Sequence, residues 1–237
     1  MEADVLAALR AHAAREAPRE CCGLIIARAG AHEYRPCRNL AADGNQFALD
    51  AADQAAAEDA GEVLAVCHSH PFANPAPSAA DRAMCEATGL PWVIVNHPLG
   101  TVCEFAPAGY RAPLIGRQFV HGVHDCYSLI RDYYAAEIGI ALPDFERADK
   151  WWLNGGDLYR AHFAEAGFVE IDAMDLRAHD VILMRIRAAV TNHGAVYLGE
   201  NRMLQHLMDK LSGRAIYGGW YRRCTTHILR HRQTSSR

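Results

Sequence analysis

The segment Val63–Pro71, VLAVCHSHP, decides how the first half of the chain folds. Its apolar residues run directly into His68, which predicts a buried strand. Because residues two apart on a strand point to the same side, His68 and His70 can bind one metal ion. The sequence from Ser78 to Asp81 predicts the first turn of a helix, with Ser78 as its cap, and this turn brings Asp81 back toward the histidines. Two imidazoles and one carboxylate are typical ligands of catalytic zinc, which keeps a fourth position for water.

A carboxylate upstream completes this candidate site, since Glu20 precedes another apolar stretch and is a candidate general base beside the metal. In order and spacing the site resembles the JAMM (MPN-plus) metalloprotease motif, with matching positions Glu20, His68, His70, Ser78 and Asp81. The resemblance implies a Zn²⁺ ion held by His68, His70 and Asp81. It also implies that Glu20 deprotonates the bound water and that Ser78 helps to polarise the scissile carbonyl.

The alternative for this segment is a strand that ends in two surface histidines, with Ser78 acting only as a helix cap. All five residues stand in register, and this argues for the metal site, because a short motif alone often matches by chance. Two histidines and one aspartate with open coordination favour zinc over magnesium.

Composition excludes some classes of protein. The chain has 237 residues, a formal net charge of −4 and no long run of one sign, so we expect neither nucleic-acid nor membrane binding. No apolar run approaches the ~18 residues of a membrane span, and no export leader opens the sequence. The eight cysteines include no CxxC pair and lie mostly in apolar segments, so we expect free thiols in a reducing cytoplasm.

The sequence predicts two halves joined by a linker. Proline and glycine crowd the stretch 106–113, APAGYRAP, which predicts a linker. Strands alternate with helices before it, a pattern typical of a layered α/β sandwich. We therefore expect a first domain over residues 1–107, a linker over 108–115 and a second domain over 116–237.

The second half carries a separate set of reactive residues. Asp125 is a natural N-cap, so Cys126 lies in the first turn of a predicted helix, where the helix N-terminus stabilises a thiolate. His193 opens an alternating strand and is a candidate base. The next predicted strand, 203–207, carries Gln205 and His206, and either could orient the His193 ring to complete a Cys–His–polar triad. Neighbouring strand residues point to opposite faces, so only one of the two can serve.

These residues resemble the NlpC/P60 family of papain-like cysteine peptidases. The matching positions are Asp125-Cys126, Asp180–Leu183 and His193–Leu198. The resemblance implies that Cys126 is the nucleophile and His193 the base, with Gln205 at the orienting position in an ungapped comparison and His206 as its competitor. Phe119 occupies the region where the family usually has a tyrosine. The alternative for Cys126 is a buried core thiol.

The order of the two domains resembles the tail assembly protein K group of lambda-like phages over nearly the whole chain. The resemblance implies a fold of α/β and α+β type, with a JAMM-type sheet and flanking helices followed by a papain-like NlpC/P60 domain. It implies a tail-tip component that is present in the host cytoplasm during assembly and then in the virion tail, with other tail proteins as partners. Peptidoglycan peptides are the expected substrate of the cysteine site, and a peptide or isopeptide bond that of the metal site.

Three classes of function remain open at this point. The first is a phage-tail protein with both peptidase activities. The second is a cellular hydrolase, either a ubiquitin-like-modifier peptidase or a wall hydrolase. The third is a structural tail factor whose two sites are inactive.

Overall fold

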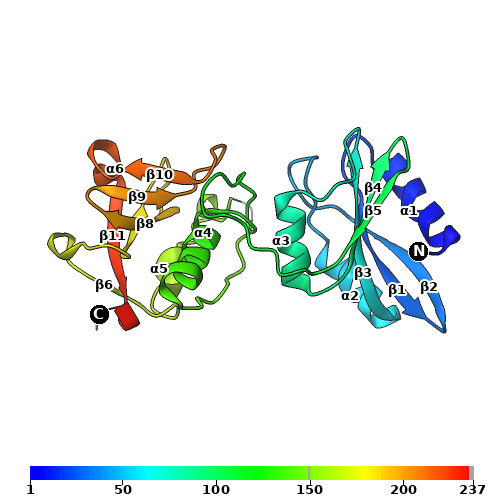
Figure 1. Ribbon diagram of the computed structural model, residues 1–237, viewed down its shortest axis with the longest axis horizontal. Helices are drawn as coiled ribbons and strands as arrows, with labels where there is room; N and C mark the ends of the chain where they lie inside the picture. The colour runs from blue at the N-terminus through cyan, green and yellow to red at the C-terminus, as the bar shows by residue number, and fades with distance from the viewer. Residues whose placement is uncertain (149, 235–237) are drawn as a thin grey trace. The chain divides into compact units, whose positions relative to one another are not determined.

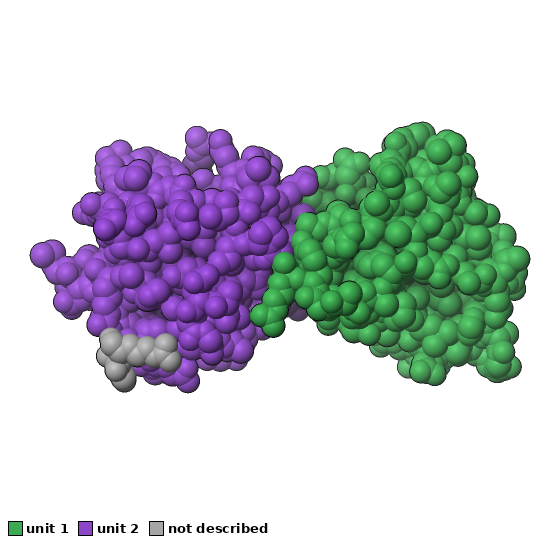
Figure 2. Space-filling view, in the orientation of Figure 1, with its two compact units in different colours: residues 1–111 green, residues 112–237 purple. Residues whose placement is uncertain are grey.

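The computed structural model describes residues 1–148 and 150–234 (Figure 1). The chain divides into two compact units, residues 1–111 and residues 112–237 (Figure 2). No helix in the described part of the chain combines the length and apolar character needed to cross a membrane.

The first unit is built on a five-stranded sheet with the strand order β2-β1-β3-β4-β5. Strands β3 and β4 are parallel and the other pairs are antiparallel. The strands are β1 (Cys22–Arg28), β2 (Ala31–Cys37), β3 (Glu62–Pro71), β4 (Trp92–His97) and β5 (Val102–Phe105). The helices are α1 (Ala3–Glu16), α2 (Ala51–Ala60) and α3 (Ala79–Thr88).

Successive residues of a strand point to opposite faces of the sheet, and apolar residues line both faces. On one face Ala65 and Cys67 of β3 pack with Val5 and Leu9 of α1. On the other face Val66 lies in a cluster with Ala57 of α2 and Cys85 of α3. The unit is therefore a three-layer sandwich with α1 on one side of the sheet and α2 and α3 on the other (Figure 1).

The second unit is built on a six-stranded antiparallel sheet with the order β10-β9-β8-β7-β11-β6. The strands are β6 (Phe168–Glu170), β7 (Val181–Met184), β8 (His193–Gly199), β9 (Arg202–Gln205), β10 (Gly213–Ile216) and β11 (Thr225–His231). The α-helices are α4 (Cys126–Tyr133), α5 (Leu158–His162) and α6 (Gly219–Cys224). Shorter turns of π- or 3₁₀-helix are η1 (Tyr134–Ile138), η2 (Trp151–Leu153), η3 (Ala173–Asp175) and η4 (Arg232–Thr234).

Helix α4 packs on one face of this second sheet. Its residues Leu129, Ile130 and Tyr133 share a buried cluster with Leu183 of β7 and Val196 of β8. This packing holds the first turn of α4 beside the start of β8, the two places where the sequence puts Cys126 and His193.

The connection between the units is bound at both ends. The carboxylate of Glu86 on α3 accepts the backbone N–H groups of Ala108 and Tyr110 at 2.6 and 2.8 Å. The buried guanidinium of Arg117 donates to the carbonyl oxygens of Ala112 and Pro113. Each end of the connecting segment is therefore held by a side chain of its own unit.

Candidate metal and cysteine–histidine sites

Three potential metal ligands meet where β3 ends and α3 begins. His68 Nε2 lies 3.1 Å from His70 Nε2 and 3.3 Å from Asp81 Oδ1, and His70 Nε2 lies 3.6 Å from Asp81 Oδ2. These are the residues that the sequence selects, and the structure brings all three within one ion's reach.

The spacing of these atoms fits a small tetrahedral cation. Ligand bonds of about 2.0–2.1 Å to a tetrahedral zinc ion place neighbouring ligand atoms about 3.3 Å apart. The two histidine nitrogens, 3.1 Å apart, lie near that value, while the distances of 3.3 and 3.6 Å run to the two different oxygens of Asp81. The donor set of two imidazoles and one carboxylate also leaves one tetrahedral position for a water or a substrate.

The surroundings of His68 and Asp81 favour the form that binds metal, whereas those of His70 do not: burial lowers the pKa of His70, but hydrogen bonds to Asp81 and Asn74 raise it above its ordinary value. His68 is fully buried and stacks on Phe47 with ring centroids 4.6 Å apart. Burial lowers the pKa of His68, so its ring is neutral near pH 7. The Nδ1 atom of His70 donates to the carbonyl oxygen of Asn74 at 2.8 Å, which leaves Nε2 as the ligand atom. Burial alone would raise the pKa of Asp81, but hydrogen bonds from both histidines hold it well below its usual range.

Glu20 and Ser78 flank this group. Glu20 is 8% exposed and lies close enough to His70 and Asp81 for their charges to act on it. Burial raises the pKa of Glu20 to about 7, the charge of His70 opposes this rise, and that of Asp81 adds to it. Ser78 is exposed, and its Oγ atom accepts the N–H of Asp81 as the cap of α3, so its hydroxyl hydrogen remains available to another group.

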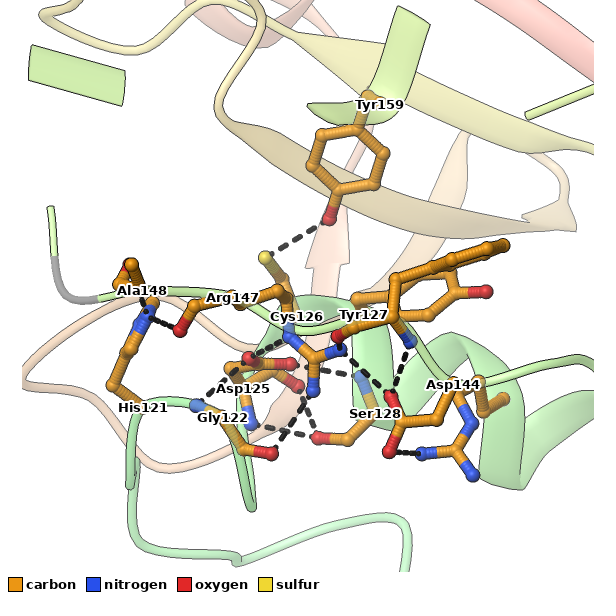
Figure 3. Close-up of polar contacts among 12 residues, drawn as sticks. His121, Gly122, Asp125, Cys126, Tyr127, Ser128, Asp144, Arg147, Ala148 and Tyr159 are labelled. Atoms are coloured by element: carbon orange, nitrogen blue, oxygen red, sulfur yellow. Dashed lines mark hydrogen bonds and ion pairs between the residues drawn. The ribbon is translucent and has the colours of Figure 1, made fainter. Parts of the chain in front are cut away.

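In the second unit Cys126 begins α4 directly after its cap, Asp125. Its sulfur is 3.1 Å from the hydroxyl of Tyr159 (Figure 3). The backbone N–H of Gly194 lies within hydrogen-bonding reach of the same sulfur. Gly194 directly follows His193, so the start of β8 lies beside the thiol. A Cβ atom at Gly194 would stand 2.8 Å from Ile130 Cδ1 and 3.0 Å from the Tyr159 hydroxyl, so a side chain there would displace these neighbours. Burial and the Asp125 charge raise the pKa of Cys126 to about 11.

His193 is buried and pairs with Gln205. Its Nε2 atom is 3.1 Å from Gln205 Oε1, while Gln205 Nε2 donates to the hydroxyl of Tyr221 at 2.9 Å. The bond to Tyr221 points the amide oxygen of Gln205 at the imidazole, so His193 Nε2 carries the proton and Nδ1 carries the lone pair. Burial lowers the pKa of His193 to about 4, so the ring is neutral near pH 7.

His206 lies close enough to His193 for its charge to act on it, but it is not the hydrogen-bond partner of His193. Strand β9 ends at Gln205, so the predicted strand over 203–207 is two residues too long, because pairing with β10 stops where Gln205 meets Gly213. His206 is fully buried with its ring 5.2 Å from that of Phe119, and its polar neighbours are the backbone groups of Arg117 and Lys210. Of the two residues that the sequence leaves open, Gln205 is the one that contacts His193.

The sequence patterns do not identify three residues that contact the cysteine–histidine site. Tyr159, Tyr221 and Arg147 contact Cys126, Gln205 and Asp125 respectively. Tyr159 and Arg147 lie in or beside the irregular stretch between α4 and β6, where no periodic pattern marks a position.

Two family models match the chain. The model described as prokaryotic homologs of the JAB domain matches residues 2–106, and that of the NlpC/P60 family matches residues 116–230. A curated relative, the tail tip assembly protein K of Escherichia phage N15, is 40% identical over 235 residues, which cover 98% of this chain and 96% of that protein.

The chain belongs to the tail tip assembly protein K family.

Other proteins are similar to part of the chain. The tail tip assembly protein K of Escherichia phage lambda is 39% identical over 176 residues, 74% of this chain and 85% of that protein. Protein DSY2949 from Desulfitobacterium hafniense is similar over 45% of this chain and 88% of its own, at 25% identity and a TM-score of 0.36. The NlpC/p60 domain of peptidoglycan hydrolase SagA is similar over 49% of this chain and 89% of its own, at 15% identity and a TM-score of 0.36.

These matches confirm the two-domain order that the sequence predicts, and with it the mixed α/β fold of a JAB-like domain followed by an NlpC/P60 domain. The NlpC/P60 domain supports a hydrolase of the peptidase type. The metal ligands and the roles of Cys126, His193 and Gln205 remain predictions.

Proposed function

We propose that this member of the tail tip assembly protein K family is a tail-tip component with two hydrolytic sites. The cysteine site cleaves peptidoglycan peptides, and the metal site cleaves a peptide or isopeptide bond. The observation that carries the proposal is the chain of contacts from Tyr221 through Gln205 to His193, which fixes a neutral imidazole at the start of the strand beside Cys126.

At the cysteine site Nδ1 of His193 accepts the thiol proton as the sulfur of Cys126 attacks the carbonyl carbon of the substrate. Both groups are neutral near pH 7, so proton transfer accompanies the attack. His193 then protonates the leaving amine, and the acyl group stays on Cys126 as a thioester. Water, deprotonated by the same histidine, hydrolyses this thioester and restores the thiol. Gln205 holds the ring in the one tautomer that can do this.

At the other site the fitting cofactor is Zn²⁺, with His68, His70 and Asp81 as ligands. When bound, such an ion lowers the pKa of a water and polarises a carbonyl group. Glu20 accepts a proton at its carboxylate, for which its raised pKa of about 7 is suited. Ser78 donates its hydroxyl hydrogen to the substrate carbonyl oxygen.

The expected partners are inferred from the two relatives that are named tail tip assembly protein K. We infer that the protein assembles with other tail proteins in the host cytoplasm and remains in the virion tail. Co-purification with tail proteins tests this inference and separates it from a cellular hydrolase without a virion role.

The experiment that tests the activity is hydrolysis of purified peptidoglycan by wild type, Cys126→Ser and His68→Ala, with the released peptides identified by mass spectrometry. We expect cleavage by wild type and by His68→Ala and none by Cys126→Ser. Cleavage that survives in Cys126→Ser would contradict the assignment of the nucleophile. No cleavage by wild type would favour protein processing or a structural role in the tail.

A further inference from the structure

Arg147 lies buried against the first turn of α4. Its positive charge takes no part in the proposed reaction. Its side chain is 7% exposed, and its Nε atom is 2.7 Å from Asp125 Oδ2 (Figure 3). One terminal nitrogen donates to the carbonyl oxygen of Gly122 at 2.9 Å and the other to Asp144 Oδ1 at 2.7 Å. The guanidinium also stands 5.2 Å from the ring centre of Tyr127.

Its partner Asp125 precedes the thiol directly and is equally buried. Oδ1 of Asp125 accepts the N–H of Ser128 at 2.8 Å and so caps α4, while Oδ2 accepts the N–H of Gly122 at 3.0 Å. Serine or asparagine would cap the helix as well without adding a charge. A buried carboxylate beside a nucleophilic thiol opposes thiolate formation, because like charges repel strongly where water is excluded.

We propose that Arg147 is a positioning residue for Cys126: its guanidinium neutralises the Asp125 carboxylate beside the thiol and holds the segment 144–148 against the start of α4. Asp125 then caps the helix without placing an unbalanced negative charge next to the nucleophile. The segment 144–148 is held in addition by His121, whose Nε2 atom contacts the carbonyl oxygens of Arg147 and Ala148 at 3.0 and 3.1 Å.

The electrostatic effects on the two groups agree with this arrangement. Burial favours the neutral acid, but Arg147 holds the pKa of Asp125 below its ordinary value, so the carboxylate is charged at neutral pH. Burial and Asp125 raise the pKa of Cys126, whereas Tyr159 and Arg147 act in the opposite direction. The charged and titratable groups of neighbouring segments that interact with Cys126 or Asp125 are His121, His124, Arg147, Tyr159 and His206.

The test is the rate at which iodoacetamide alkylates Cys126 at a fixed, mildly alkaline pH, because only the thiolate reacts. Trypsin releases Cys126 in the fragment 118–131, which contains no other cysteine, so mass spectrometry reads this thiol alone. We compare wild type with Arg147→Gln, with Arg147→Lys and with the double variant Asp125→Asn/Arg147→Gln. Alkylation of Cys103, in the other unit, is the internal control for reagent and handling.

We expect Arg147→Gln to slow alkylation of Cys126 about tenfold, since an unbalanced neighbouring charge shifts a pKa by about one unit or more. Arg147→Lys keeps the charge and stays within about threefold of wild type. The double variant, which removes both charges, returns to within the same range. A purely structural Arg147 predicts no recovery in the double variant.

An unchanged or faster rate in folded Arg147→Gln, or a double variant as slow as the single one, overturns the proposal. If Arg147→Gln does not fold, Arg147→Lys decides, because a tenfold drop despite the retained charge contradicts an electrostatic role. The inference rests on the proposed role of Cys126 as nucleophile. Alkylation needs no substrate, however, so a failure of wall cleavage and a failure of this inference are distinguishable.

Discussion

Ser78 and Asp81 exchange two hydrogen bonds across the first turn of α3. The N–H of Ser78 donates to Asp81 Oδ2 at 2.7 Å, and the N–H of Asp81 donates to Ser78 Oγ at 3.1 Å. The carboxylate of Asp81 is also the proposed third metal ligand. One capping box therefore both starts α3 and fixes the orientation of this ligand.

Removal of this cap is expected to affect stability and activity separately. Ser78→Ala should lower the free energy of unfolding by about 1 kcal/mol, as measured by denaturant titration. Ser78→Asn restores a cap and should recover most of that free energy. If the hydroxyl acts on the substrate, activity of the metal site stays low in both variants, whereas recovery of activity with Ser78→Asn would assign Ser78 to capping alone.

Loss of a ligand should remove the metal and leave the other unit intact. His68→Ala and Asp81→Ala are each expected to lose bound zinc, measured by elemental analysis after dialysis. Alkylation of Cys126 should stay at the wild-type rate in both. Asp59→Ala, an exposed carboxylate on α2, is the matched control and should retain the metal. Equal zinc content in all four proteins would rule out the proposed ligand set.

Gln205 and His206 should respond in opposite ways to substitution. Gln205→Ala removes the acceptor that fixes the His193 tautomer and should reduce peptidoglycan cleavage more than about tenfold. Gln205→His offers an acceptor in the same place and should retain part of the activity. His206→Phe removes an imidazole that makes no hydrogen bond with His193, so peptidoglycan cleavage should persist. Loss of cleavage in His206→Phe with Gln205→Ala still active would reverse the assignment.

Acid should destabilise the second unit through His193. The pKa of His193 is about 4 in the folded protein and about 6.5 in the unfolded chain. Between these two values the unfolded chain binds a proton at His193 and the folded chain does not. Stability from this residue is full above pH 6.5 and falls toward pH 4, by up to about 3 kcal/mol. Denaturant titrations across this range should show a shallower decline for His193→Gln than for wild type. Parallel curves for the two proteins would contradict the lowered pKa.

The connecting segment makes a prediction for proteolysis. Arg111 is exposed between the residues that Glu86 and Arg117 bind, so trypsin should cut there first in the folded protein. Glu86→Gln weakens the acceptor for Ala108 and Tyr110 and should speed this cut. Glu58→Gln on α2 is the control and should leave the rate unchanged. Initial cleavage inside either unit would contradict the binding of the segment at both ends.

Much of both sites can be predicted from local patterns. The apolar run before His68 and the cap at Ser78 predict a strand and a helix whose ends must meet, and the structure brings their ligands together. The cap at Asp125 likewise places Cys126 at the start of α4. These features depend on residues close in sequence, which is why a pattern can reveal them.

The remaining features depend on contacts between distant segments. The choice between Gln205 and His206 follows from where β9 stops pairing with β10, and a sequence pattern does not give that register. Tyr159 reaches Cys126 from a short helix after an irregular stretch, so only the packing of the chain reveals it. The stacking of Phe47 on His68 arises in the same way.

Glu86 and Arg117 tie the two ends of the connecting segment to different halves of the molecule. A chimaera joined at Arg111 to the matching domain of another member of the family would therefore keep, in each half, the side chain that binds its own end of the segment. The connecting segment is thus the place where the two domains can be exchanged as whole units.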